Sequence, residues 1–438
     1  MSFPRYLDYK DSGINWLGQV PTHWEIKRLK NVISLRKNLV GESKGSYTLL
    51  SLTLHGVIPR NMDNPKGKFP AEFDTYQVVE KDDLVFCLFD VEETPRAVGI
   101  SPCKGMVTGA YTVGRVNGGV SASFFYNYHL SRDQYKAFKM YYTGLRNVIR
   151  TENFLDIPCP LPPLNEQLEI SKFLDHQTNK VDLLIAEQQK LIEILKEKRQ
   201  AVISHAVTKG LDSNVKLKNS GVEWLGDVPE HWVVHKIKSL TSRISSGKTP
   251  NGGSEVYVDD GVVFLRSQNV YDEGLRINEV VYIPEMVDQQ MATSRVQSGD
   301  ILLNITGGSI GRSCSVPKDF PNANVNQHVC VIRLVNPQLL PFVEIFFKSF
   351  AIKSQIDFVQ NGAAREGLNF EQIGNMSLCL PPLSEQKQIV DQVMNEFGRY
   401  SSLISEAEMS VGLLLERRMA LVFSAVTGQI DVRNLNAV

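Results

Sequence analysis

Residues 161–210 read LPPLNEQLEISKFLDHQTNKVDLLIAEQQKLIEILKEKRQAVISHAVTKG, and this stretch decides the fold. It opens with two prolines, and no further proline or glycine follows until Gly210, which stands where a C-cap glycine belongs. We expect Asn165 to be the N-cap, and Glu166 suits the positive end of the helix dipole. The stretch therefore predicts a single helix of roughly 65 Å, at ~1.5 Å per residue.

Apolar residues recur along this helix in two heptad seams. One seam is Leu174, Val181, Gln188, Leu195 and Val202, and the other is Ile170, Gln177, Leu184, Leu191 and Lys198. Because most of these positions are apolar, the helix needs a partner along most of its length.

The composition indicates an ordinary globular protein. With 438 residues, 42% hydrophobic and 22% charged, the chain suffices for about two to four domains. It has no run of ~18 apolar residues to span a membrane. The N-terminal sequence MSFPRYLDYKDSG lacks an apolar signal core, so we expect the protein to stay in the cytoplasm. The six cysteines form no CxxC pair, which argues against a zinc site or a disulfide framework.

The chain contains an internal duplication. Residues 12–24 read SGINWLGQVPTHW and residues 220–232 read SGVEWLGDVPEHW, with nine of the thirteen positions identical. A match of this quality predicts two copies of one structural unit.

The long helix is repeated as well. LPPLNEQ at 161–167 returns as LPPLSEQ at 380–386, and 197–209 matches 416–428 at the same offset. The second pair of seams is Val393, Tyr400, Ala407, Leu414 and Leu421, with Ile389, Glu396, Leu403, Ser410 and Arg417. Polar residues interrupt both helices at matching places, so we predict that the two helices pair, antiparallel, with an approximate two-fold axis. The alternative is two unrelated helices, each packed on its own domain.

Two globular segments lie between these repeats, at about 25–160 and 233–379. Short β-like runs (47–54, 83–89, 262–265 and 300–305) alternate with glycine-rich turns, and helical stretches are expected near 131–149 and 338–360. The predicted fold class is α+β. The predicted division is 1–160, 161–210, 211–379 and 380–438: a recognition domain, a helix, a second recognition domain and a second helix. The two globules are not expected to resemble each other in detail, so the sequence suggests a duplicated scaffold that carries two different recognition domains.

No catalytic motif is complete. Gly247-Lys-Thr249 resembles the end of a phosphate-binding loop, but Ser242 replaces the first glycine and Pro250 follows directly. Gly307 to Gly311 is glycine-rich without a surrounding βαβ unit, which favours a tight loop. No histidine and glutamate pair has metal-ligand spacing, and we expect no metal site and no bound cofactor. His23 and His231 each precede a tryptophan, so we expect them to be packed or hydrogen-bonded.

Polar residues of the kind that contact DNA gather in the predicted loops. The candidates in the second globule are Lys248, Thr249, Asn251, Arg266, Gln268, Asn269, Ser309, Arg312, Asn326, Gln327 and Arg365. Those in the first are Thr53, Arg60, Lys66, Lys68, Arg96 and Tyr111. Arginine pairs with guanine, asparagine and glutamine with adenine, and serine or threonine with phosphate. Residues 25–160 carry 18 basic and 14 acidic side chains, whereas 233–379 carry 13 and 14, so only the first globule has a basic excess.

The repeated SGxxWLGxVPxHW motifs, followed by LPPLxEQ and a long helix ending in AVTxG, resemble the specificity subunit of type I restriction–modification enzymes. In the second globule SGKTP (246–250), FLRSQNV (264–270), GSIGR (308–312), NQH (326–328) and LN (368–369) are similar to that family's target-recognition domains. The first globule, with SLTLHGVIPR (51–60) and FDVEETPRAVGIS (89–101), resembles a different branch of such domains. It has TGAYTV (108–113) where the NQH-like segment would stand.

The resemblance implies a non-catalytic subunit that reads a bipartite, asymmetric site in double-stranded DNA, one half per globule. It implies that the helix pair (Leu174, Val181, Leu184, Leu191 and Leu195 with Val393, Leu403, Leu414 and Leu421) is a spacer between the half-sites. The implied partners are two methyltransferase subunits, which bring S-adenosylmethionine and methylate adenine, and restriction subunits, which use ATP and Mg²⁺ to cleave DNA.

Three alternatives remain open from the sequence. The chain could serve another restriction class, in which methyltransferase and nuclease are fused in one partner. It could be a coiled-coil adaptor that binds only proteins, or an enzyme in its own right, which the missing motifs disfavour.

Overall fold

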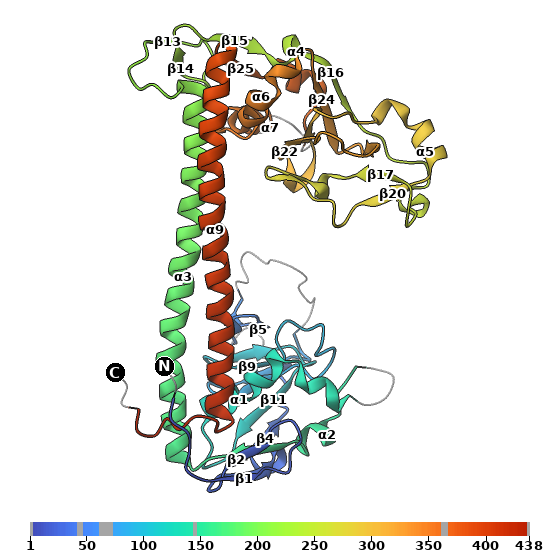
Figure 1. Ribbon diagram of the computed structural model, residues 1–438. Coiled ribbons are helices and arrows are strands. Elements are labelled where there is room, and N and C mark those ends of the chain that lie inside the picture. The colour runs from blue at the N-terminus through green and yellow to red at the C-terminus, as the bar shows by residue number, and fades with distance from the viewer. Residues whose placement is uncertain (1–2, 42–46, 61–72, 143–146, 361–366, 436–438) are drawn as a thin grey trace. The chain divides into compact units, whose positions relative to one another are not determined.

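The computed structural model describes residues 3–41, 47–60, 73–142, 147–360 and 367–435 (Figure 1). The chain forms two compact units. Unit 1 contains Met1–Gln189 and Met409–Val438, and unit 2 contains Lys190–Glu408. Each long helix, α3 (Leu164–Lys209) or α9 (Leu383–Val426), is continuous and contributes one part to each unit. Unit 1 therefore joins two stretches that lie far apart in the sequence, whereas unit 2 is one continuous stretch.

The ends of α3 and α9 follow the predicted stop signals. Gly210 and Gly428 follow the two helices with φ of +77° and +75°, the left-handed conformation that glycine adopts without strain. At the other end α3 begins at Leu164, so Asn165 lies in its first turn and is not the N-cap. Glu166 does stand in that first turn, as predicted.

The two helices pair antiparallel in unit 2. Lys196 Nζ lies 3.5 Å from Glu408 Oε1, and Arg199 Nη1 donates to Ser401 Oγ at 3.2 Å. The contacts therefore move backwards along α9 as they move forwards along α3. In unit 1 the early part of α3 meets the late part of α9, where Arg418 Nε donates to Asp182 Oδ1 at 2.8 Å.

The buried seam differs partly from the heptad prediction. Leu174, Val181 and Val393 are buried as expected, and Leu195, Leu414 and Leu421 are half-buried. By contrast Leu184, Leu191 and Leu403 are exposed, whereas Ile185 and Ile404 are buried. A helix has about 3.6 residues per turn, so a strict seven-residue repeat drifts around it unless the helices supercoil. The second seam is therefore shifted by one residue where Ile185 and Ile404 replace their neighbours.

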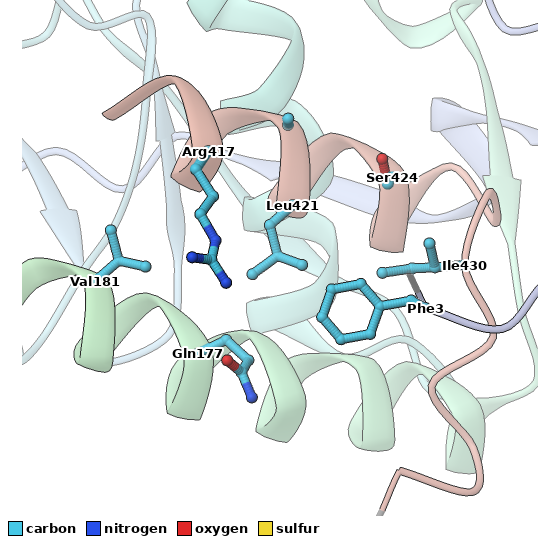
Figure 2. A pocket seen from close by; sticks show the side chains of 8 residues that line it. Phe3, Gln177, Val181, Arg417, Leu421, Ser424 and Ile430 are labelled. Carbon is cyan, nitrogen blue, oxygen red and sulfur yellow. The ribbon is translucent and has the colours of Figure 1, made fainter. Parts of the chain in front are cut away.

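Polar interruptions of the two helices meet in unit 1. Gln177 of α3 and Arg417 of α9 line one cavity of about 330 Å³, together with Phe3, Leu421 and Ile430 (Figure 2). Figure 2 shows the Arg417 side chain reaching from α9 towards α3. The polar positions that break the heptads therefore face the same space.

Unit 1 contains a four-stranded antiparallel sheet in the order β4-β11-β8-β9. Its strands are β4 (Ile33–Arg36), β8 (Leu84–Phe86), β9 (Val98–Ile100) and β11 (Thr112–Val116). Four antiparallel pairs of strands accompany this sheet in the described part of unit 1. They are β1 (Tyr9–Asp11) with β2 (Gln19–Pro21), β3 (Glu25–Arg28) with β12 (Pro158–Leu161), β5 (Leu50–Thr53) with β6 (Gly56–Pro59), and β7 (Gln77–Val79) with β10 (Gly105–Val107).

Unit 2 repeats this central sheet with the order β16-β24-β21-β22. The strands are β16 (Thr241–Ser246), β21 (Ile301–Asn304), β22 (Ser313–Ser315) and β24 (Val329–Leu334). In both units the first strand pairs with the fourth, the fourth with the second, and the second with the third. The expectation that the globules differ in detail is therefore wrong for their central sheets.

A buried aspartate anchors both central sheets in the same way. Asp83 immediately precedes β8 and Asp300 immediately precedes β21, and both are almost completely buried. Arg115 on β11 donates to Asp83 at 2.6 Å, and Arg333 on β24 donates twice to Asp300 at 2.7 Å. A buried carboxylate needs such a charge-assisted partner. The shared ion pair joins the second and fourth strands in each unit.

The two units diverge outside this sheet. Unit 2 has a three-stranded sheet of β20 (Val281–Ile283), β17 (Val262–Leu265) and β23 (Ala323–Val325), and the pairs β13 (Leu217–Asn219) with β14 (Asp227–Pro229), β15 (Val233–Lys236) with β25 (Ser377–Leu380), and β18 (Val270–Tyr271) with β19 (Gly274–Leu275). Its shorter helices are α4 (Ile237–Leu240), α5 (Glu285–Gln290), α6 (Leu340–Phe347), α7 (Phe350–Gln360) and α8 (Phe370–Asn375).

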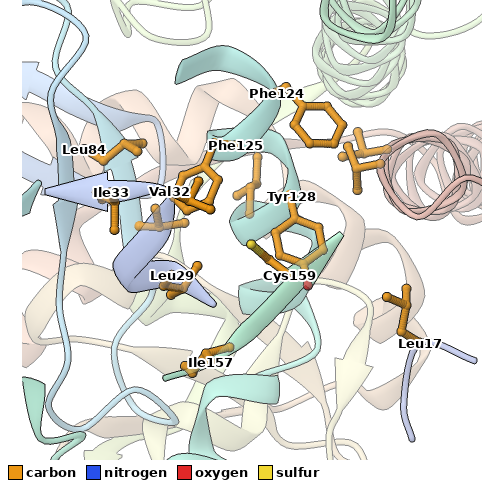
Figure 3. Packing of buried hydrophobic residues seen from close by; sticks show 14 of the residues in the cluster. Leu17, Leu29, Val32, Ile33, Leu84, Phe124, Phe125, Tyr128, Ile157 and Cys159 are labelled. Atoms are coloured by element: carbon orange, nitrogen blue, oxygen red, sulfur yellow. The ribbon is translucent and has the colours of Figure 1, made fainter. Parts of the chain in front are cut away.

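The expected helices at the end of each globule are found with one shift. The expectation near 338–360 is confirmed by α6 and α7. In unit 1 the main helix is α1 (Ala122–Gln134), earlier than the predicted 131–149, and α2 (Thr151–Leu155) follows. Phe124, Phe125 and Tyr128 project from α1 into the main core of unit 1 (Figure 3).

Glu166 joins the repeated motifs of unit 1. Its side chain is buried and accepts hydrogen bonds from Tyr6 Oη at 2.6 Å and Trp24 Nε1 at 2.9 Å. His23 Nε2 lies 2.7 Å from the other carboxylate oxygen. Burial and the adjacent carboxylate raise the pKa of Tyr6 far above its ordinary value, so this phenol stays a hydrogen-bond donor. The histidine and tryptophan that end the 12–24 motif therefore contact the glutamate of the LPPLNEQ segment at 161–167.

Unit 2 contains the same arrangement around a glutamate. Trp232 Nε1 donates to Glu385 Oε1 at 3.1 Å, and His231 Nε2 lies 2.7 Å from Glu385 Oε2. The expectation that His23 and His231 are packed or hydrogen-bonded is confirmed. Both motifs recur together in the sequence because each closes one unit around the start of a long helix.

Replacing Gly428 by alanine is expected to lower the melting temperature of unit 1. A Cβ atom there would lie 2.4 Å from Pro21 Cδ, and the backbone is already left-handed. Such a conformation costs a residue other than glycine on the order of 1–3 kcal/mol, before the clash is counted.

Gly412→Ala is the matched control, because it lies in α9 of the same unit and its Cβ would meet nothing within 4 Å. Alanine in a helix interior should stabilise by about 0.5–1 kcal/mol relative to glycine. Thermal unfolding followed by circular dichroism measures both variants. Equal melting temperatures would contradict the close packing of the α9 end against the 12–24 motif.

Candidate nucleic-acid interface

Several loops of unit 2 converge where the strands of its two sheets end. The loop after β16 packs so closely on the loop after β23 that a Cβ at Gly247 would lie 1.7 Å from the carbonyl oxygen of Val325. The Lys248 amide donates to that same carbonyl at 3.1 Å, and the Asn326 amide donates to Leu265 O at 3.0 Å. Only glycine permits this approach of two backbones. We call the segments 246–251, 265–269, 304–312 and 325–328 the unit 2 loop cluster.

A chain of polar side chains crosses this cluster. Thr249 Oγ1 is hydrogen-bonded to Gln327 Oε1, and Gln327 Nε2 lies 2.9 Å from His328 Nε2. Thr306 Oγ1 lies 2.5 Å from the other ring nitrogen of His328. The exposed amide of Gln327 lies between Thr249 and His328 in this chain, so hydrogen bonds on both sides set its orientation before any ligand binds.

Two of the predicted contact residues hold loops in shape. Asn269 is almost fully buried; its Oδ1 accepts from the Arg266 amide at 2.9 Å and its Nδ2 donates to Arg276 O at 3.0 Å. Asn326 is buried as well, and its Oδ1 accepts from the His328 amide at 3.2 Å. Their side chains are occupied by the protein backbone.

Asn304 ties two loops of the cluster together. Its Nδ2 donates to Ser267 O at 2.8 Å and to Ser309 Oγ at 3.1 Å. The predicted residue Ser309 therefore serves as an internal acceptor. Within the described residues, Asn304 Oδ1 is buried without a hydrogen-bond partner.

The predicted residues Arg266 and Arg312 lie against aromatic rings, as does Arg276, which was not among the predicted residues. The Arg312 guanidinium lies 4.8 Å from the centre of the Tyr271 ring, and Arg276 lies 3.5 Å from that centre. Arg266 lies 5.9 Å from the Tyr257 ring and donates to Glu279 O at 3.3 Å. Stacking of this kind holds a guanidinium in place while its edge stays available for hydrogen bonds.

Five predicted residues of the cluster are exposed, and two of them, Thr249 and Gln327, are hydrogen-bonded to each other. The five are Lys248, Thr249, Asn251, Gln268 and Gln327. They supply one cation, one hydroxyl and three amides, which is the chemistry of phosphate and base-edge contacts. Arg365 lies outside the described residues.

The candidates in unit 1 are more dispersed. Thr53 Oγ1 donates to Gly56 O at 3.0 Å within the β5–β6 turn, and Arg96 donates to Leu54 O at 2.5 Å and to Tyr126 Oη at 3.3 Å. Thr53 and Arg96 are thus brought to one turn. Tyr111 stacks on Phe89 with centroids 6.4 Å apart, and burial raises the pKa of its phenol.

Of the remaining unit 1 candidates, only Arg60 lies among the described residues. Arg60 is half-buried, and its backbone amide donates to Leu49 O at 2.8 Å. Lys66 and Lys68 lie outside the described residues.

No cluster of three or more metal-ligating side chains is found in the described part of the chain. Among the same residues, no helix combines the length and hydropathy that a membrane span requires.

A family model described as "Type I restriction modification DNA specificity domain" matches residues 229–406, which include the whole unit 2 loop cluster. These residues are therefore similar to type I DNA specificity domains. The resemblance to type I specificity subunits, inferred from the repeated motifs, is confirmed.

Curated relatives of the chain carry matching names. The specificity subunit of the type I restriction enzyme EcoBI from Escherichia coli is 27% identical over 290 residues, which are 64% of this chain and 59% of that protein. That of EcoKI from Escherichia coli (strain K12) is 26% identical over 66% of this chain and 61% of that protein. The matched part of the chain thus spans about three fifths of these two relatives. The putative MjaX specificity subunit of Methanocaldococcus jannaschii is 23% identical over 86% of this chain and 87% of that protein.

A solved structure shares the fold. A chain from a study of complex assembly and conformational transition of the type I R-M system matches with a TM-score of 0.66, covering 93% of this chain and 98% of that chain at 14% identity. The mixed α/β fold with a long central helix is therefore that of a known type I system chain.

Sequence reasoning missed four residues that shape the unit 2 loop cluster. His328 and Thr306 orient Gln327, Asn304 links two loops, and Tyr271 supports two arginines. The NQH segment contained the signal for His328, since a histidine beside two amides in a loop can act as their hydrogen-bond partner. Asn304 and Tyr271 are the last residues of β21 and β18, and no local pattern distinguishes them from other strand residues.

Proposed function

We propose that the chain is a non-catalytic DNA-reading subunit that recognises a bipartite, asymmetric site in double-stranded DNA. Unit 2 reads one half-site through its loop cluster, and the globule of unit 1 reads the other. The observation that carries this proposal is the combination of a shared central sheet with different loops. Two domains that share a framework but differ in their loops can present different base contacts from the same kind of scaffold.

Methyltransferase and restriction subunits are the proposed partners. Two copies of the methyltransferase would dock on the duplicated scaffold, bringing S-adenosylmethionine and flipping the adenine to be methylated. The restriction subunits would use ATP and Mg²⁺ to cleave DNA in the cytoplasm. Support for protein partners comes from large apolar side chains that stay exposed on the long helices of unit 1: Leu183 (67%), Met409 (66%) and Leu413 (60%). The helices α3 and α9 would act as the spacer between the half-sites.

Exchanging residues 25–160 for the equivalent segment of another such subunit tests the independence of the two readers. With the methyltransferase partner co-expressed, we expect sequencing of methylated genomic DNA to show one altered half-site and one unchanged half-site. The exchange retains the contacts of Glu166 with Tyr6, His23 and Trp24, because all four residues lie outside the exchanged segment. A change in both half-sites would contradict separate reading.

Salt dependence separates this function from that of a protein-only adaptor. A DNA reader loses affinity steeply with salt, because each neutralised phosphate releases counterions. The assembled complex is therefore expected to bind its DNA site with a negative slope of log affinity against log salt. Absence of DNA binding by a complex that still assembles would favour the adaptor.

A further inference from the structure

Two arginines of unit 2, Arg276 and Arg312, share one aromatic ring and have no counter-charge among the described residues. Their guanidinium carbons lie 3.5 Å and 4.8 Å from the centre of the Tyr271 ring. Within the described chain, neither guanidinium forms an ion pair or a hydrogen bond. Arg276 is exposed and Arg312 is half-buried, so a ligand can reach both side chains from solvent.

The other arginines in the described part of unit 2 differ from this pair. Each of them has at least one oxygen partner on the protein, which is a carboxylate or a backbone carbonyl. These six are Arg199, Arg243, Arg266, Arg295, Arg333 and Arg399. The pair on the Tyr271 ring is therefore distinguished by its free N–H groups.

The two acidic residues that follow Tyr271 pair with other cations. Asp272 lies 3.1 Å from Lys353 Nζ, and Glu273 lies 3.3 Å from Arg199 Nη2. These carboxylates therefore do not neutralise the two guanidinium groups beside the ring. Like charges that are held close together repel each other, and an anion bound between them replaces this repulsion by attraction.

Both arginines are fixed by their backbones to segments of the unit 2 loop cluster. The Arg276 amide donates to Asn269 O at 2.9 Å, and its carbonyl accepts from Asn269 Nδ2 at 3.0 Å. The Arg312 amide donates to Ser309 O at 3.2 Å, and its carbonyl accepts from the Asn304 amide at 2.9 Å. The pair therefore belongs to the same loops as the exposed amides of the cluster.

We propose that Arg276 and Arg312, held on the Tyr271 ring, bind one phosphodiester of the DNA backbone beside the bases that the unit 2 loop cluster reads. This inference rests on the proposed function, and it assigns Arg312 to the backbone instead of to guanine. A phosphate has several oxygen acceptors and can bind two guanidinium groups, whereas a guanine edge pairs with one arginine. Backbone contacts fix the register of a protein on the duplex. Tyr271 is a positioning residue, because its ring restrains both side chains before DNA binds.

The test uses the full chain assembled with its methyltransferase partner, and a duplex of the site that methylation sequencing defines. Each phosphate around the half-site read by unit 2 is replaced, one at a time, by an uncharged methylphosphonate. We expect one replacement to weaken wild-type binding roughly five- to tenfold at about 0.1 M salt. The same replacement should have no effect on the Arg276→Gln, Arg312→Gln double variant. If every replacement weakens the double variant as much as the wild type, the pair contacts no backbone phosphate and the proposal is overturned.

Salt dependence provides a second measurement. One neutralised phosphate contributes about −0.9 to the slope of log affinity against log salt, so the slope of the double variant should be less steep by about one. Lys318→Gln is the control, because it removes an exposed positive charge beyond the far end of β22 from Arg312, and it should keep the wild-type slope. An unchanged slope in the double variant, or an equal change in the control, would contradict the proposal.

A DNA library randomised in both half-sites separates a backbone contact from a base contact. We expect the double variant to bind all sequences more weakly and to keep the base preference of the wild type. Loss of preference for one base with an unchanged salt slope would mean that the guanidinium groups read a base edge, and the proposal would be wrong. If the wild-type complex binds no DNA, the proposed function and this inference fail together. If it binds specifically and the double variant matches it, only this inference fails.

Two substitutions of Tyr271 test the role of the ring, with thermal unfolding as the check that unit 2 is folded. Tyr271→Phe keeps the aromatic face, so we expect the affinity and the salt slope of the wild type. Tyr271→Leu removes the face that holds both guanidinium groups, and it should weaken DNA binding about two- to fivefold. Equal affinities of the two variants would show that the ring does not position the arginines.

Discussion

Glu166→Ala is expected to lower the free energy of unfolding of unit 1 by about 3 kcal/mol or more. The carboxylate is the shared acceptor for Tyr6 and Trp24, both buried, and it contacts His23. Its removal leaves two buried donors without an acceptor, at roughly 1–3 kcal/mol each. Denaturant unfolding, followed by tryptophan fluorescence and by hydrogen exchange of α1 and α3 amides, measures the loss in unit 1.

Glu385→Ala is the matched control in unit 2. Its carboxylate has two partners, Trp232 and His231, and it is 28% exposed, so water replaces part of what is lost. We expect a smaller destabilisation, confined to unit 2. Glu166→Gln should fall between wild type and Glu166→Ala, because the amide oxygen still accepts one hydrogen bond. Equal losses of unfolding free energy for the two alanine variants would show that burial and the third donor do not decide how much each glutamate stabilises its unit.

The duplication and the long helices could be predicted because their signals are local. A repeated motif indicates a duplication, and a pair of prolines and a terminal glycine indicate the ends of a helix; each signal lies within a few residues. The reason the motifs recur together could not be predicted, since Glu166 and Trp24 are 142 residues apart in the chain. The heptad reading placed Leu184 in the seam, whereas Ile185 is buried, because the choice between adjacent positions depends on how far the helices supercoil.

The common central sheet was missed for a related reason. Strand order is set by long-range pairing, such as β11 with β4 and β8, which leaves little trace in a single sequence. One trace does exist: an aspartate precedes a short apolar strand at both Asp83 and Asp300. A charged residue that opens an otherwise apolar run is a signal for a buried ion pair, and here it marks the same strand in both units.

Among the candidate contact residues, residue type alone does not predict which side chains are exposed. Asn269 and Gln327 both carry amide side chains in the unit 2 loop cluster, so residue type alone does not distinguish them. Burial separates them, because Asn269 is closed within its own turn and Gln327 is exposed. A side chain already bonded to backbone shapes the surface, whereas an exposed and oriented one can read a base.

Gln327→Ala is therefore expected to relax specificity at one base of the half-site read by unit 2, if the proposed function holds. A well-placed amide contact is worth about 1–3 kcal/mol of discrimination, so the preference for that base should fall roughly 10- to 100-fold. Binding of the assembled complex to a library randomised in both half-sites, read by sequencing, measures the change at each position. The unfolding free energy of unit 2 should stay unchanged, because Gln327 is exposed and its partner His328 keeps its hydrogen bond to Thr306.

Asn269→Ala provides the opposite pattern. It removes two hydrogen bonds from a buried side chain, leaving the Arg266 amide and the Arg276 carbonyl without their partner. We expect unit 2 to lose about 2 kcal/mol of stability, since unsatisfied buried groups cost roughly 1–3 kcal/mol. DNA affinity should then fall for all sequences together, with the base preference retained. If Gln327→Ala destabilised the unit and Asn269→Ala altered the preference at one base, the division between reading and shaping residues would be reversed, and exposure would not identify the readers in this loop cluster.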